Sequence, residues 1–204
     1  MAVKVHDNYT QLNALYNIMA DDSSENLKNM DSIAEIYLRI NMGMAALKMS
    51  EKILVKDPEN EKMLELKAEG SVGQGKDAEA LNINRKLYEK TKKIKYLFNI
   101  ANVQLEANNM KDLDQTLDHI KTSPGYQKDT IEVADNQSGR LQKVPAPAAM
   151  AYMEAMIGYQ KKDIKEMFTK LKQAVAIFPD FINANRAIQA IMQQQQQQQS
   201  QGKR

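Results

Sequence analysis

Few residues of this 204-residue chain have the types and spacing that catalysis or metal binding requires. The chain has no cysteine and two histidines, His6 and His119, which are far apart in the sequence. Because a zinc site takes about four ligands at suitable spacing, neither histidine indicates one, and we expect His119 to be a polar residue on a helix surface. The segment Ser71–Asp77 (SVGQGKD) lacks the spacing of a phosphate-binding loop. We therefore predict no enzyme activity, no metal and no cofactor.

The composition gives no sign of a nucleic-acid or membrane-surface partner. Charged residues make up 26% of the chain, hydrophobic residues 43%, and the formal net charge is +2. A charge this balanced does not indicate nucleic-acid binding. The chain as given contains neither an apolar run long enough to span a bilayer nor a hydrophobic signal region at its start. These features leave the compartment open.

The elements that must position any binding residues form a repeat. Apolar and small residues between residues 29 and 60 have helical spacing in two halves, with a break at Asn41 and an end at Pro58. This pattern predicts two antiparallel helices. A shift of 34 residues then brings similar side chains into register: Met30 with Leu64, Ala34 with Ala68, Ala46 with Ala80, and Ile53 with Leu87.

This period and its alternation of small and large residues resemble the tetratricopeptide repeat (TPR) family. The best-matching units are Leu27–Asn60 and Glu61–Ile94; a third unit is weaker, a fourth fits well, and the resemblance covers roughly Leu27–Pro179. It implies an all-α protein, a right-handed superhelical solenoid of antiparallel helix pairs. In such an array the first helices line a concave groove.

The pattern predicts six segments. Residues 1–26 resemble the second half of a repeat, which is either a lone N-terminal cap or part of a longer array. The other segments are three TPR-like repeats (27–128), an insertion (129–146), a fourth repeat (147–180), a capping helix (181–192) and a glutamine-rich tail (193–204), which we expect to be disordered.

The insertion is the one stretch that does not have helical spacing. Two runs rich in β-branched or apolar residues, TIEV and RLQKV, flank the turn-forming residues DNQSG. The stretch predicts a β-hairpin between repeats three and four, with a mobile polar loop as the alternative. An ordered hairpin must pack apolar side chains on repeats three and four or on a second molecule, so it is a candidate partner or homodimer contact through Ile131, Val133, Leu141 and Val144.

The resemblance also implies which residues face the groove. They are Lys28, Asp31, Glu35 and Leu38 in repeat one, Lys62, Glu65 and Glu69 in repeat two, Tyr96, Asn99 and Val103 in repeat three, and Met153 and Ile157 in repeat four. The groove is then acidic at its N-terminal end and apolar at its C-terminal end, which suits a basic and apolar segment of a partner. Asp31 and Glu35 stand where some family members have a basic clamp for carboxylates, so that particular ligand is not expected.

Two functions remain open at this stage. The first is a non-catalytic protein–protein interaction scaffold that binds a peptide or protein segment in the groove. The alternative is a structural or assembly subunit that oligomerises through the hairpin and the convex face. RNA binding is a weak third option, because the groove lacks basic residues.

Overall fold

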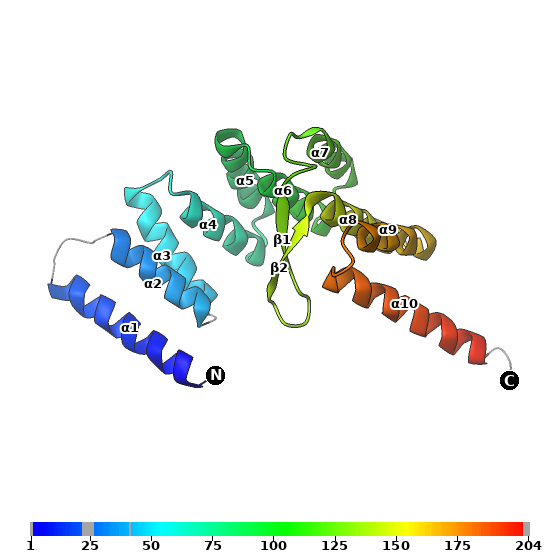
Figure 1. The fold of residues 1–204 in the computed structure, drawn as a ribbon. Helices are drawn as coiled ribbons and strands as arrows, with labels where there is room; N and C mark the ends of the chain where they lie inside the picture. Colours follow the sequence, from blue (N-terminus) through cyan, green and yellow to red (C-terminus); the bar gives the residue numbers. More distant parts are fainter. Residues whose placement is uncertain (1, 22–26, 41, 202–204) are drawn as a thin grey trace. The chain divides into compact units, whose positions relative to one another are not determined.

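The computed structural model describes residues 2–21, 27–40 and 42–201 of the chain. These residues form antiparallel helix pairs and one β-hairpin (Figure 1), as the repeat pattern predicts. The chain divides into two compact units, residues 1–92 and 93–204. No helix within the described ranges is both long enough and apolar enough to cross a membrane.

The first unit consists of an N-terminal helix and two helix pairs. Its elements are α1 (Ala2–Asp21), α2 (Leu27–Arg39), α3 (Gly43–Lys56), α4 (Glu61–Gly73) and α5 (Asp77–Thr91), and each helix packs against the next one along the chain. The small residues of the repeat pattern, Ala34, Ala46 and Ala80, are completely buried. Their short side chains let neighbouring helices approach closely, which is why small residues recur at these positions.

The second unit consists of two helix pairs, the hairpin between them and a long C-terminal helix. Its helices are α6 (Lys95–Glu106), α7 (Met110–Thr122), α8 (Ala146–Gln160), α9 (Ile164–Ile177) and α10 (Ile182–Gln201). The helices pair as α6 with α7, α8 with α9, and α9 with α10. A line of buried alanines in α8, Ala148, Ala151 and Ala155, allows the close packing of α8 in this unit.

Side chains at the helix starts and a glycine in one turn fix the helix boundaries. Asn60, Asn109 and Asp163 each accept a hydrogen bond from the backbone N–H three residues later, and so begin α4, α7 and α9. Gly75, in the turn between α4 and α5, has a φ of +71°. Glycine adopts this left-handed conformation without strain.

The inserted segment is an ordered hairpin rather than the polar loop that was the alternative. Strands β1 (Thr130–Ala134) and β2 (Leu141–Pro145) are antiparallel, with Ile131 opposite Val144. Both of these side chains are buried, whereas Leu141 is 65% exposed. The hairpin therefore has one face toward the helices and one toward solvent, as the alternation of side chains along a strand requires.

The C-terminal helix is longer than the sequence predicts. The glutamine-rich segment was expected to be disordered from residue 193, but α10 continues through it to Gln201. Glutamine has a good intrinsic helix propensity, so a helix that has already begun at Ile182 extends into this segment at little cost. The structure thus describes residues 193–201 as part of α10, and residues 202–204 lie outside the described part of the chain.

Candidate protein-binding surfaces

The acidic residues predicted to face a groove lie on the first helices of the two pairs in the first unit. Asp31 and Glu35 are on α2, and Glu65 and Glu69 are on α4. In each pair the residues are four apart, so they lie on one side of their helix. We call these four residues, together with Lys28 and Lys62, the acidic face.

One ion pair crosses the acidic face. Lys62 of α4 donates a hydrogen bond to Glu35 of α2, and both side chains are about half exposed. Partial burial raises the pKa of Asp31; Lys62 acts in the opposite direction, and the nearby carboxylates Glu35 and Asp57 raise it further. The surroundings of Asp31 are therefore rich in negative charge despite the lysine. The sequence pattern gave no sign that Asp57 lies near Asp31.

Most of the residues predicted to line the groove in the second unit are buried. Tyr96 is completely buried, and Val103, Met153 and Ile157 are nearly so; Asn99 is exposed. The expected apolar binding surface is therefore largely part of the packed interior in this structure. A repeat register identifies which side of a helix a residue occupies, but it does not show that an insertion packs against that side.

The hairpin packs against part of this side of the second unit, next to Asn99 and Met153. Strand β1 contacts both α6 and α8, which are the first helices of their pairs. A cavity of about 160 Å³ remains between the strand and these helices; Asn99 and Met153, both predicted groove residues, line it together with Ile131 and Val133 of the hairpin. The hairpin thus covers part of the first-helix side of the second unit.

The turn end of the hairpin is fastened to the start of α10. Arg186 forms an ion pair with Asp135, and the side-chain amide of Asn183 donates to the Ala134 carbonyl oxygen at 2.8 Å. Gln142 of β2 donates to the Asp180 carbonyl oxygen at 2.7 Å and accepts from the N–H of Ile182 at 3.1 Å. Sequence reasoning missed these contacts, which carry no periodic signal.

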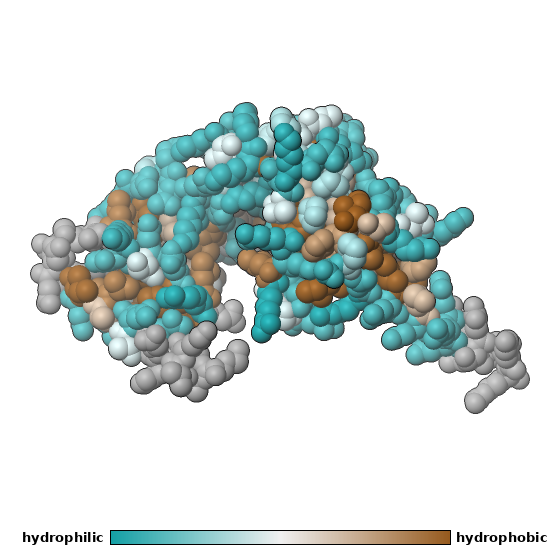
Figure 2. All heavy atoms as spheres, in the orientation of Figure 1, coloured by the Kyte–Doolittle hydropathy of each residue, from teal (hydrophilic) through white to brown (hydrophobic). Residues whose placement is uncertain are grey.

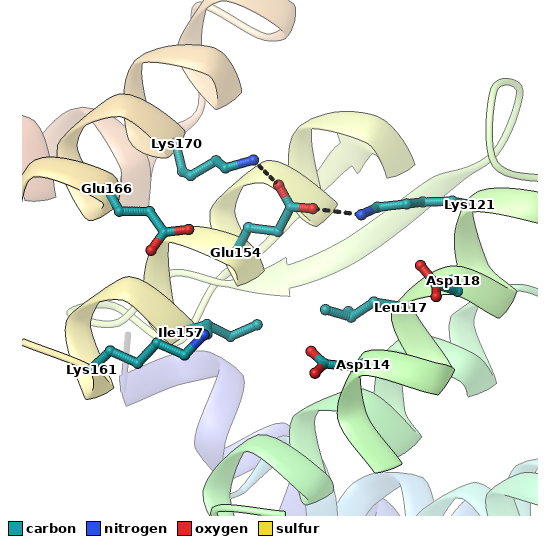
Figure 3. A pocket seen from close by; sticks show the side chains of 9 residues that line it. All are labelled: Asp114, Leu117, Asp118, Lys121, Glu154, Ile157, Lys161, Glu166 and Lys170. Atoms are coloured by element: carbon teal, nitrogen blue, oxygen red, sulfur yellow. Dashed lines mark hydrogen bonds and ion pairs between the residues drawn. The ribbon is translucent and has the colours of Figure 1, made fainter. Parts of the chain in front are cut away.

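A charged cleft of about 320 Å³ lies between α7, α8 and α9 (Figure 3). Glu154 of α8 accepts from Lys121 of α7 at 2.8 Å and from Lys170 of α9 at 2.6 Å. Leu117 and Ile157 point toward each other across the cleft (Figure 3). Burial alone raises the pKa of Glu154, but the hydrogen bonds from the two lysines outweigh this and hold its pKa below the ordinary value. The Glu154 carboxylate therefore joins three helices.

Hydrophobic side chains also reach the surface of the second unit. Figure 2 shows them around α8 and α9, between hydrophilic side chains. Tyr159 is 61% exposed, and Ile164 and Ile177 are exposed by 47% and 41%. Single exposed apolar residues are normal on a protein surface, so these residues do not by themselves define a site.

The described residues contain no cluster of groups that indicates a reaction. Within the described ranges, no group of three or more histidine, cysteine, aspartate or glutamate residues is placed to hold a metal ion. His119 is an exposed residue of α7, as expected. In the cleft in Figure 3, Glu154 forms ion pairs with Lys121 and Lys170, an arrangement suited to stability.

The arrangement defines a helical-repeat protein, and solved structures share it. YrrB, described as a TPR protein with an unusual peptide-binding site, is 18% identical, with a TM-score of 0.59 over 91% of this chain and 85% of YrrB. A tetratricopeptide repeat protein from Parabacteroides merdae is 17% identical, with a TM-score of 0.64 over 91% of this chain and 66% of that one. A thermophilic TPR protein from Thermus thermophilus is 10% identical, with a TM-score of 0.59 over 89% of each chain.

This chain therefore has the TPR fold, as the repeat pattern predicts. At these low identities the likeness concerns the fold alone. No protein-family model matches the sequence, and no curated protein is similar to it.

Proposed function

We propose that this chain is a non-catalytic scaffold for protein–protein interaction, which binds a segment of a partner protein along the acidic face. The observation that carries this proposal is the exposure of charged side chains on the first helices of the first unit: Lys28, Glu35, Lys62 and Glu69 are all exposed. The peptide-binding site described for YrrB, which has the same fold, supports binding as the general function of such an array. Fold alone does not fix the ligand.

The charge of the acidic face selects a basic partner segment. The acidic face contains four carboxylates and two lysines. The raised pKa of Asp31 reflects its burial and the negative charge around it. Leu38, at the C-terminal end of α2, is 45% exposed and offers an apolar contact beside these charges. A segment with lysine or arginine and one apolar anchor fits this combination.

A peptide titration tests the proposal directly. The probe is a short synthetic peptide of lysine and leucine, and the same peptide with glutamate in place of lysine is its control. The wild type should bind the lysine peptide, with an affinity that falls as salt rises, because exposed charges are screened beyond about 8–10 Å at physiological ionic strength. The glutamate peptide should not bind.

Charge reversal on the acidic face should remove this binding. We expect the double variant Glu35→Lys with Glu69→Lys to weaken binding of the lysine peptide. The control is Glu51→Lys with Glu89→Lys, at exposed sites of the second helices α3 and α5. It makes the same change in net charge and should preserve binding. Equal affinities for both double variants would show that the acidic face is not the binding surface.

The assembly-subunit alternative has less support from the hairpin. Ile131 and Val144 are buried within their own chain, and the free edge of β2 carries Lys143 and Pro145, two residue types that hinder strand pairing between molecules. Leu141 remains as the exposed apolar residue of β2. A monomer in sedimentation at micromolar concentration agrees with the scaffold, and a stable dimer that Leu141→Lys dissociates would favour the alternative.

A further inference from the structure

Strand β1 lies on a surface of the second unit that three helices build. Ile131 is buried and Val133 half-buried against α6 and α8, whereas Glu132 and Ala134 are exposed. The end of the strand reaches α10. Ile131 and Val133, at alternate positions of the strand, line the cavity between the strand and the helices.

One side chain of α10 recognises the backbone of this strand. Asn183 Nδ2 donates to the carbonyl oxygen of Ala134 at 2.8 Å, and the backbone N–H of Asn136 donates to Asn183 Oδ1 at 3.2 Å. A carboxamide carries both a donor and an acceptor, so Asn183 takes the place of a neighbouring strand at this edge. The contact uses backbone groups on either side of Asp135 and does not use the side chains of Ala134 or Asn136.

A second side chain of α10 recognises the carboxylate of Asp135. The guanidinium of Arg186 pairs with it, and the Asp135 side chain is only 7% exposed. Hydrogen bonds from Arg186, from the Ser138 hydroxyl and from the N–H of Gln137 hold the pKa of Asp135 well below its ordinary value. Arginine presents a planar fork of donors that matches a carboxylate, so this contact is specific for an acidic residue.

We infer that this surface is a binding site for an extended segment with apolar residues at two alternate positions followed by an aspartate, and that β1 of the chain's own hairpin occupies it. In the hairpin, the two apolar residues are Ile131 and Val133 and the aspartate is Asp135. Asn183 hydrogen-bonds the backbone beside Asp135, and Arg186 pairs with the Asp135 carboxylate. A partner segment of the same chemistry binds here in competition with the hairpin. This acidic, apolar ligand differs from the basic one proposed for the first unit, so neither inference depends on the other.

The hairpin has an advantage over any free segment because it is covalently attached at both ends. Tethering gives it a high effective concentration at the site. The wild type should therefore bind a free copy of the β1 sequence weakly. Removing the hairpin's own anchors while keeping the receiving residues should open the site.

The test uses a fluorescein-labelled peptide with the sequence of residues 128–137, and its binding is measured by fluorescence anisotropy. The hairpin variant Ile131→Ser with Asp135→Asn loses both anchors and keeps Asn183 and Arg186. We expect this hairpin variant to bind the peptide at least about tenfold more tightly than the wild type does. Adding Arg186→Gln to the hairpin variant should lower its affinity for the peptide about tenfold, as expected for the loss of a charge-assisted hydrogen bond. A peptide with asparagine in place of the aspartate should bind equally weakly to the variants with and without Arg186→Gln.

Three outcomes would overturn the inference. One is equal affinity of the wild type and the hairpin variant for the peptide, with helix content unchanged in circular dichroism. If the variant loses helix content, hydrogen exchange of the wild type decides instead: millimolar peptide should speed exchange of the β1 amides, and unchanged rates would contradict the proposal. A wild-type dimer that the hairpin variant cannot form would place the hairpin of a second copy in the site.

Discussion

Lys121 Nζ lies 2.8 Å from Glu154 Oε1, and this contact joins α7 to α8 in the second unit. The carboxylate side chain is only 17% exposed and also accepts from Lys170. A partly shielded carboxylate with two ammonium partners is held more firmly than an exposed surface pair. Its removal should therefore be measurable in the stability of the protein.

Glu154→Gln should lower the free energy of unfolding by about 1.5–3 kcal/mol at neutral pH, the range for hydrogen bonds to charged groups. Because the folded pKa of Glu154 is lowered, its contribution is present above the ordinary glutamate pKa and is lost as pH falls through the folded pKa. Denaturant unfolding should show the gap between the two proteins closing in acid. Glu166→Gln, in the same cleft, is the control, and an equal loss there would contradict a special role for Glu154.

Gly158 and Gly73 should respond to alanine in opposite ways. A Cβ atom on Gly158 would lie 2.9 Å from the backbone N of Met167, whereas one on Gly73 would meet nothing within 4 Å. Overpacking against backbone costs about 1–3 kcal/mol, which outweighs the helix-propensity gain of about 1 kcal/mol. Gly158→Ala should therefore lower Tm, and Gly73→Ala should leave it unchanged or raise it. A rise of Tm in both variants would show that α8 and α9 are packed less closely than in this structure.

Ala80→Leu should destabilise the first unit by about 1–3 kcal/mol, because Ala80 is completely buried and a larger side chain overpacks the site. Ala78→Leu, at an exposed position of the same helix, makes the same chemical change without the clash. Urea unfolding of both variants measures the difference. Similar midpoints for the two variants would mean that the helix contact at Ala80 can expand freely.

Asp31→Asn should stabilise the protein at neutral pH. The raised folded pKa of Asp31 means that its charged form is disfavoured in the folded state, so the penalty is present above the folded pKa and absent below the ordinary aspartate pKa. We expect a gain of up to about 0.5 kcal/mol, the usual range for surface substitutions, that disappears in acid. Lower stability of the variant at neutral pH would show that the negative charge of Asp31 is favourable where it stands.

The sequence predicts the fold well because the fold depends on local and periodic signals. Ala46 and Ala80 mark the helix contacts, and the alternation in TIEV with the turn formers after it marks the hairpin. Both signals lie within a few tens of residues and follow from helix and strand geometry.

The binding surfaces are predicted less well. Asn183 and Ala134 are 49 residues apart, and a single asparagine in a helix carries no sign of a partner so distant. Tyr96 and Val103 were placed on a groove wall by the repeat register, but they are buried in the structure. Where an insertion folds back depends on side-chain contacts between separate elements, which a repeat pattern does not contain.

The fastening of the hairpin to α10 also has a consequence for the order of assembly during synthesis. Repeat arrays generally gain structure through contacts between neighbours, and each helix pair can settle soon after it leaves the ribosome. In the second unit, however, the hairpin contacts residues about fifty positions further along the chain, such as Arg186. Contacts of this separation slow folding, because a long loop must close before they form. In a nascent chain, the ion pair between Asp135 and Arg186 can therefore form only after the start of α10 has been translated.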